Sequence, residues 1–315
     1  MTRVAAIDCG TNSIRLLVAD VPAEGAHTDL LRRMEVVRLG QGVDATGRLA
    51  PEAIERTRLV LAEYADQARE LGAERVRMVA TSASRDAANR ADFEAMVHAT
   101  LGQLPDVVPG VEEAELSYLG ATASLTAAAR AHGAEPPRPP FLVVDIGGGS
   151  TEFVLGDADG VRAARSVDVG CVRLTERHLR SDPPPPAEVQ AAEVDIRAAL
   201  AQVGADVPVP EARTLVGLAG SVTTVAALAL GLPAYDPVAI RGSRIPVEAV
   251  REVTAGLLAA TRAQRAASPV MHPGRVDVIG AGALVLRVVM DTFGLAEVVV
   301  SEHDILDGIA LRLAR

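Results

Sequence analysis

The chain contains no lysine: its 31 basic residues are all arginine, against 41 acidic residues and a net charge of −10 at pH 7. A general nucleic-acid binder presents a basic face to the phosphate backbone, so this acidic balance argues against nucleic acid as a partner. Any positive contact to phosphate must come from arginine, a metal ion or the N-terminus of a helix. A polyanionic substrate would therefore need a local positive site, with Mg²⁺ screening its charge.

Cysteines are scarce, and long apolar runs are missing. Two cysteines, Cys9 and Cys171, are too few for a disulfide framework and fit a reducing compartment. No run approaches the ~18 apolar residues of a membrane span, so we expect no membrane partner. Residues Met1 to Ala5 lead straight into an apolar stretch without the basic region and cleavage site of an export signal. The expected location is the cytoplasm.

One segment occurs twice. Residues 7–20 read IDCGTNSIRLLVAD and residues 144–157 read VDIGGGSTEFVLGD. A gapless alignment pairs Asp8 with Asp145, Gly10 with Gly147, Ser13 with Ser150 and Asp20 with Asp157. In each copy an apolar strand ends in Asp, a loop of small residues follows, and a second apolar strand returns. Two such hairpins predict a duplicated domain with a phosphate compound bound between the halves.

Both hairpin loops are candidates for phosphate binding. Glycine lets the backbone approach a ligand closely, so that successive N–H groups can point at one anion, and hydroxyl groups add donors. The carboxylate at each strand end can hold a divalent cation or a water, or it can simply cap the loop. The alternative is that both loops are ordinary hairpin turns. The candidate phosphate ligands are Gly10, Thr11, Asn12 and Ser13 in the first loop and Gly147, Gly148, Gly149, Ser150 and Thr151 in the second.

The rest of the chain predicts two domains of mixed α/β structure. The length of 315 residues is enough for about two domains, and strands alternate with helices in both halves. The segment 131–140, AHGAEPPRPP, is the best linker because its proline and glycine cannot pack a core. The predicted domains are 1–131 and 141–302. We expect strands at 76–80, 107–108, 161–169, 214–218 and 298–300, and helices at 51–71, 91–101, 111–129, 170–179, from about 187, from 222, around 284–290 and at 303–315.

Six motifs carry a resemblance to a known family. In chain order they read IDCGTNSIRLL, ATSASRDAANR, PGVEEAELSYLG, VVDIGGGSTEF, GLAGSVTTVAAL and RVDVIGAGAL. Each is weak alone, but six in this order, spread over essentially the whole chain, are specific. The chain resembles the exopolyphosphatase and guanosine pentaphosphate phosphohydrolase (Ppx/GppA) family in its short two-domain form, within the superfamily of actin, sugar kinases and chaperone ATPases.

The resemblance implies a fold and a reaction. The fold is two ribonuclease-H-like α/β domains (the actin-like ATPase fold) with an interdomain cleft, and helix 303–315 packs back on the first domain. The reaction is exopolyphosphatase activity: hydrolysis of the terminal phosphate of inorganic polyphosphate by a glutamate-activated water, with Mg²⁺ or Mn²⁺. Two alternatives stay open, namely removal of the 5′ γ-phosphate of guanosine pentaphosphate and a non-hydrolytic sensor of polyphosphate or alarmone. The oligomeric state also stays open, a homodimer being one option.

The resemblance also implies roles for four carboxylates. Glu113 is the second Glu of the family's EEA motif and would be the base that polarises water. Its alternative is a carboxylate that stabilises the dipole of a helix start. Glu152 would orient the water or the metal, unless it is a solvated strand residue. Asp8 and Asp145 would hold Mg²⁺, directly or through water, together with Glu152.

Three further residues receive phosphate-binding roles from the same resemblance. Arg85 matches the family's arginine, and its bidentate fork suits a phosphate group. The alternative is an arginine that faces solvent. Gly220 and Ser221 precede a helix, where N–H groups could meet a further anion. The alternative there is a simple helix N-cap.

A rival mechanism follows from Cys9 and Arg15, which form the C-x₅-R pattern of cysteine-dependent phosphatases. That pattern requires a helix after the loop, because the helix N-terminus lowers the thiol pKa. Residues 14–18 read instead as a β-strand, and the duplicate loop has Ile146 at the nucleophile position. The cysteine mechanism is therefore disfavoured. The six histidines show no metal-ligand spacing in the sequence and receive no role.

Overall fold

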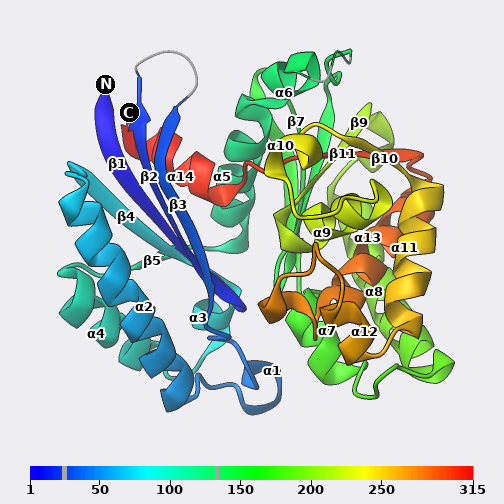
Figure 1. The fold of residues 1–315 in the computed structure, drawn as a ribbon, viewed down its shortest axis with the longest axis horizontal. Coiled ribbons are helices and arrows are strands. Elements are labelled where there is room, and N and C mark those ends of the chain that lie inside the picture. The colour runs from blue at the N-terminus through cyan, green and yellow to red at the C-terminus, as the bar shows by residue number, and fades with distance from the viewer. Residues whose placement is uncertain (23–26, 132, 134, 315) are drawn as a thin grey trace. The chain divides into compact units, whose positions relative to one another are not determined.

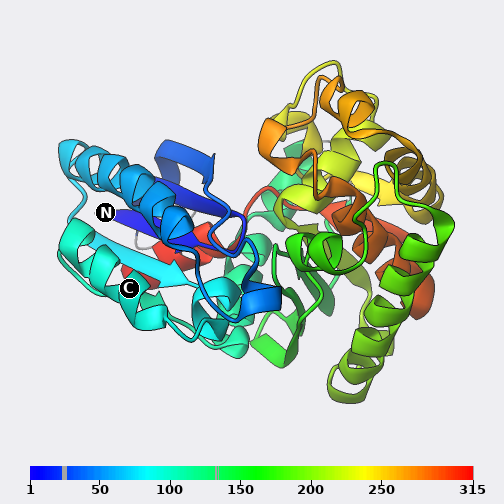
Figure 2. The same ribbon diagram turned by 90° about the horizontal axis from the view of Figure 1, so that it is seen from below.

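The computed structural model describes residues 1–22, 27–131, 133 and 135–314, and its chain divides into two compact units (Figure 1). The first unit comprises residues 1–123 and 303–315, and the second comprises 124–302. The boundary therefore lies before the Pro- and Gly-rich segment 131–140, of which residues 132 and 134 are outside the described residues. Figure 2 shows both chain ends in the first unit.

The first unit has a five-stranded sheet in the order β3-β2-β1-β4-β5. The first three strands form an antiparallel meander, and β4 and β5 add in parallel on the other side of β1. The strands are β1 (Thr2–Cys9), β2 (Ser13–Val21), β3 (Thr28–Val36), β4 (Arg75–Ala80) and β5 (Asp106–Val107). Its helices are α1 (Val43–Thr46), α2 (Pro51–Glu70), α3 (Ser82–Asp86), α4 (Arg90–Leu101), α5 (Gly110–Ala123) and α14 (Ile305–Ala314).

Alternating residues of β1 enter two different apolar cores. Ala5 and Ile7 belong to a core that contains residues of α2 and α4, whereas Val4 and Ala6 belong to one that contains residues of α5 and α14. This alternation follows from the period of two in a strand, which sends successive side chains to opposite faces. The two helical layers flank the sheet and hold the loop after β1 in place.

The second unit repeats this arrangement with one strand more. Its sheet has the order β10-β11-β9-β6-β7-β8, so that β8, β7, β6 and β9 correspond to β3, β2, β1 and β4. The strands are β6 (Phe141–Ile146), β7 (Thr151–Asp157), β8 (Gly160–Val167), β9 (Thr214–Leu218), β10 (Arg244–Pro246) and β11 (Glu297–Val300). The helices are α6 (Leu125–Ala131), α7 (Cys171–Arg177), α8 (Pro186–Asp206), α9 (Ala219–Ala229), α10 (Pro237–Ile240), α11 (Val247–Ala259), α12 (Arg262–Ala266) and α13 (Ile279–Phe293), with 3₁₀ turns at Val209–Glu211 and Pro273–Arg275.

The elements differ from the sequence-based expectation in two places. The predicted helix 111–129 is two helices, α5 and α6, which are interrupted at Ser124. Strand β3 was not predicted, and it is an edge strand whose residues are mostly half-exposed or exposed. Within the part of the chain that the structure describes, no helix combines the length and apolar character needed to cross a membrane.

Two glycines allow α5 and α14 to cross at close range. A Cβ at Gly120 would lie 1.8 Å from the carbonyl oxygen of Asp304, and one at Gly308 would lie 1.9 Å from that of Leu116. Both obstacles are backbone atoms, which cannot move without shifting a helix. The crossing therefore requires glycine at both positions.

We expect Gly308→Ala to destabilise the protein by about 1–3 kcal/mol or more, because the added methyl group overlaps backbone in a packed core. Gly256→Ala in α11 is the matched control, since nothing lies within 4 Å of a Cβ there. That change should be neutral or stabilising by about 0.5–1 kcal/mol, because alanine is the better helix former. Denaturant unfolding measures both. Equal midpoints for the two variants would show that the crossing tolerates a side chain.

Candidate functional site

The first hairpin loop is held in shape by a later segment of the same unit. Gly10 N–H donates to Ser13 O across the loop at 3.0 Å. The carbonyl of Thr11 accepts from Gly40 N–H at 2.8 Å, and that of Asn12 accepts from the N–H groups of residues 37 and 38 at 3.1 and 2.8 Å. Because the loop carbonyls are turned toward this segment, the loop has the orientation an anion site needs, with carbonyl oxygens away from the ligand.

The second hairpin loop has the same internal contact and the same kind of support. Gly147 N–H donates to Ser150 O at 3.0 Å. The carbonyls of Gly147 and Gly148 accept from N–H groups at the start of α7. Arg173 Nε donates to the carbonyl of Gly149 at 2.8 Å. The sequence repeat is thus also a repeat of hydrogen bonding, which is more specific than two ordinary turns require.

A supporting glycine stands against each loop. A Cβ at Gly40 would lie 2.3 Å from Thr11 Cγ2, and one at Gly170 would lie 2.3 Å from the carbonyl oxygen of Gly148. In both units, therefore, the segment that receives the loop carbonyls can approach only because it lacks a side chain. Neither glycine was singled out from the sequence.

The residue opposite the strand-end aspartate differs between the units. Asp8 pairs with Arg15 in the β1–β2 register, and Asp145 pairs with Glu152 in the β6–β7 register. Directly opposed residues in an antiparallel pair share a face of the sheet. The duplicated position therefore brings a cation to the first aspartate and a second carboxylate to the other.

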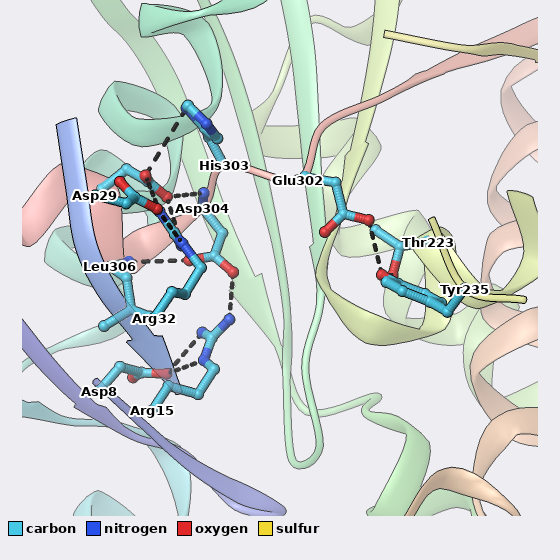
Figure 3. Close-up of polar contacts among 11 residues, drawn as sticks. Asp8, Arg15, Asp29, Arg32, Thr223, Tyr235, Glu302, His303, Asp304 and Leu306 are labelled. Atoms are coloured by element: carbon cyan, nitrogen blue, oxygen red, sulfur yellow. Dashed lines mark hydrogen bonds and ion pairs between the residues drawn. The ribbon is translucent and has the colours of Figure 1, made fainter. Parts of the chain in front are cut away.

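In the first unit, Asp8 belongs to an ion-paired chain (Figure 3). Its Oδ2 accepts from Nε and Nη2 of Arg15 at 2.9 and 2.6 Å, and Nη1 of Arg15 also pairs with Asp304. Burial raises the pKa of Asp8, and the Arg15 guanidinium offsets part of that rise. A metal at Asp8 would have to share the carboxylate with this guanidinium.

In the second unit, Asp145 and Glu152 are 8 % and 1 % exposed. Glu152 Oε1 accepts from Ser166 Oγ of β8 at 2.8 Å. Glu152 is therefore a buried and oriented carboxylate, not a solvated strand residue. Two neighbouring carboxylates repel each other, and an oxygen-only donor set of this kind fits a hard divalent cation such as Mg²⁺.

Glu113 lies in the first turn of α5 and is 8 % exposed. Its Oε2 accepts from Arg85 Nη1 at 3.1 Å, and the same nitrogen donates to the carbonyl of Val108 at 3.0 Å. Arg85 is thus fixed by partners within the unit, although a quarter of its side chain stays exposed. The loop joins this group through Thr11, whose hydroxyl is hydrogen-bonded to that of Ser82 at 2.9 Å.

Gly220 and Ser221 open α9 beside an arginine that the sequence analysis left without a role. Ala219 turns the chain into this helix with φ of 65°, a left-handed conformation that is uncommon without glycine. A Cβ at Gly220 would lie 2.3 Å from Cζ of Arg275, and Arg275 Nη1 donates to Thr224 Oγ1 at 3.2 Å. Arg275 is the only cationic residue of the sixth motif, which was the available signal. It places a positive charge at the N-terminus of α9.

A model of the Ppx/GppA phosphatase family matches residues 17–315. The chain belongs to this family. Over its whole length it is 55% identical to exopolyphosphatase 2 of Mycobacterium tuberculosis (strain ATCC 25618 / H37Rv), of which it covers 99%. It is 27% identical, over 97% of its length, to a guanosine-5′-triphosphate,3′-diphosphate pyrophosphatase of Aeromonas salmonicida, of which it covers 58%.

A solved structure gives the same result for the fold. The crystal structure of an exopolyphosphatase-like protein, 41% identical, superposes with a TM-score of 0.93 and covers 99% of this chain and 97% of that chain. The predicted family is therefore confirmed, and so is the predicted fold class of two ribonuclease-H-like α/β units.

The cysteine mechanism lacks its structural requirements in this family member. The loop after Cys9 leads into strand β2, not into a helix. Cys9 is 1 % exposed within the core beside α2 and α4, and burial raises the pKa of its thiol strongly. Burial also raises the pKa of Cys171, to about 11. Neither thiol has the lowered pKa of a phosphatase nucleophile.

Cys9→Ser should therefore keep most phosphatase activity, because the residue only fills the core. A thiolate nucleophile could not be replaced by a hydroxyl of much higher pKa without near-total loss. Phosphate release by the purified variant checks this. Loss of activity, together with a phosphoenzyme trapped in the unmodified protein, would restore the cysteine mechanism.

Proposed function

We propose that the chain is an exopolyphosphatase, which hydrolyses the terminal phosphoanhydride bond of inorganic polyphosphate. The whole-length similarity to a protein named exopolyphosphatase 2 supports this substrate class. The observation that carries the proposal is the second hairpin: a glycine-rich loop is followed directly by two buried, opposed carboxylates, Asp145 and Glu152. A phosphate loop beside a divalent-cation site is what phosphoryl transfer to water requires.

We assign the base to Glu113. Water attacks the terminal phosphorus, the bond from phosphorus to the bridging oxygen breaks, and the shortened chain leaves with that oxygen. The proton of the attacking water passes to the Glu113 carboxylate and then to solvent. Arg85 holds Oε2 of Glu113 at 3.1 Å, which orients the carboxylate, and the partly exposed guanidinium can bind a phosphate oxygen as well.

We assign the metal to Asp145 and Glu152, with Mg²⁺ as the preferred ion and Mn²⁺ as a substitute. When bound, it would neutralise charge on the phosphate oxygens. Asp8, predicted as a further ligand, accepts two hydrogen bonds from Arg15. Its proposed part is therefore to hold that guanidinium beside the first loop. The residues that bind phosphate are those of the two loops, with Arg85, Gly220, Ser221 and Arg275.

Guanosine pentaphosphate is the second candidate substrate, because a relative named for that class of compound matches nearly the whole chain. Phosphate release from long polyphosphate and from guanosine pentaphosphate, measured side by side, separates the two. We expect polyphosphate to be the better substrate by kcat/KM. A higher kcat/KM for guanosine pentaphosphate would reverse the assignment, and binding without phosphate release from either compound would indicate a sensor.

A further inference from the structure

Two histidines that lie far apart in the sequence meet in the first unit. His27 directly precedes β3, and His303 directly precedes α14; their ring centroids are 5.5 Å apart. Asp29 of β3 and Asp307 of α14 lie beside them. Figure 3 shows Asp29 and His303 in this cluster, separate from the chain of contacts through Arg15. The sequence spacing of these histidines gave no indication of a site.

The side-chain atoms have the spacing of metal ligands. His27 Nε2 lies 3.0 Å from Asp307 Oδ1 and 3.2 Å from Asp29 Oδ1, and His303 Nδ1 lies 3.8 Å from Asp307 Oδ1. One ligand atom each from His27, His303 and Asp307 all fall within 4.8 Å of one another. Bonds of about 2.1 Å in a tetrahedral zinc site place neighbouring ligand atoms about 3.4 Å apart. The observed spacings bracket that value.

A buried nitrogen points to the same conclusion. The His27 side chain is 4% exposed, and the Asp307 side chain is fully buried. His27 Nε2 is within ion-pair range of both carboxylates, yet neither contact has hydrogen-bond geometry, and among the described residues this nitrogen has no hydrogen-bond partner. A buried polar atom left in this way requires an explanation, and an unmodelled ion is one of the usual ones.

The carboxylates are oriented from outside the cluster. Arg32 Nε donates to Asp29 Oδ2 at 2.8 Å, and Arg32 Nη2 donates to Asp307 Oδ1 at 2.6 Å. The backbone N–H of Asp304 donates to Asp307 Oδ2 at 2.8 Å. These contacts leave Asp29 Oδ1 directed to the histidine side. Supporting hydrogen bonds of this kind are typical of metal-binding carboxylates.

We propose that His27, His303 and Asp307, with Asp29 as the fourth ligand, bind a zinc-class transition metal ion in a structural site that joins β3 to α14. Two imidazole nitrogens favour Zn²⁺ over Mg²⁺, which prefers oxygen ligands only. The site therefore differs in metal preference from the carboxylate pair of the second unit. Asp29 and His303, whose side chains are 38% and 17% exposed, give the ion a way in from solvent.

The rival is a closed ion-pair network without metal. Asp29 and Asp307 raise the pKa of His27 to about 9, so that in this network the two carboxylates balance one imidazolium and the Arg32 guanidinium. A metal would replace the imidazolium proton. Only one of these states binds Zn²⁺ stoichiometrically, which makes them separable by direct binding.

The test uses untagged full-length protein, stripped with a chelator and dialysed against buffered Zn²⁺ in excess Mg²⁺, with metal content measured by mass spectrometry. We expect one tightly bound zinc per chain and a raised melting temperature. His303→Ala should bind at least tenfold more weakly. His98→Ala, which removes an exposed histidine of α4, is the matched control and should bind as the unmodified protein does. Replacement by Co²⁺ should give the strong visible absorption of a tetrahedral site.

Absence of stoichiometric zinc in the unmodified protein would overturn the proposal in favour of the ion-pair network, whatever the variants do. Equal zinc binding by the unmodified protein and His303→Ala would overturn it as well. Should His303→Ala fold poorly, His303→Gln keeps a hydrogen-bonding side chain without an imidazole ligand and is expected to lose zinc in the same way.

Discussion

Replacing Glu113 with glutamine should lower the turnover of polyphosphate by roughly two to four orders of magnitude, because glutamine keeps the shape of the side chain but cannot accept the proton of the attacking water. Arg85 should still find an oxygen acceptor on the glutamine, so the site should keep its geometry. The fall should therefore appear in kcat, while the affinity for polyphosphate stays close to that of the unmodified protein. Steady-state phosphate release and a separate binding measurement check the two parts.

Glu112→Gln is the matched control for this experiment. Glu112 is the neighbouring residue in the same helix turn, but its carboxylate accepts from Arg77 at 2.9 Å, not from Arg85. Turnover by this variant should stay within about twofold, as expected for a partly exposed ion pair. Near-normal activity of Glu113→Gln, or an equal loss in both variants, would remove Glu113 from its role as base.

Removal of divalent metal should abolish hydrolysis, and Mg²⁺ or Mn²⁺ should restore it. The reason is electrostatic: Asp145 and Glu152 are opposed, buried carboxylates, and a polyphosphate end would add negative charge next to them. Asp145→Asn should raise the Mg²⁺ concentration needed for half-maximal activity by one or more orders of magnitude, about the size reported for loss of a metal-site partner. Titration of activity with Mg²⁺ in a chelator-stripped enzyme gives both results.

Asp8→Asn separates the two hairpins in the same titration. Because Asp8 accepts from Arg15, its loss should disturb the first loop and leave the Mg²⁺ requirement nearly unchanged. A Mg²⁺ requirement that shifts as strongly in Asp8→Asn as in Asp145→Asn would make Asp8 a metal ligand after all. Undiminished hydrolysis by the chelated enzyme would remove the metal role from both hairpins.

Local sequence determined most of the secondary structure and the two loops. Strand β9 spans Thr214–Leu218, as predicted from its apolar run, and the duplicated loops close with the same Gly-to-Ser backbone contact. These features depend on residues close together in the chain, whose period and turn chemistry can be read directly. Strand β3 escaped prediction because it pairs only with β2, so its half-exposed residues carry little apolar signal.

Tertiary structure alone decided which charges meet. The aligned repeat shows Arg15 and Glu152 at equivalent positions, but only strand register places each opposite an aspartate, giving an ion pair in one unit and a carboxylate pair in the other. Likewise, helix packing sets Arg275 against Gly220 and brings His303 to His27. Residues distant in the chain meet through the register and packing of whole elements, which the apolar pattern specifies only as faces. The sequence by itself therefore determined the family, the fold class and the loops, and the fold determined the partners of each charged group.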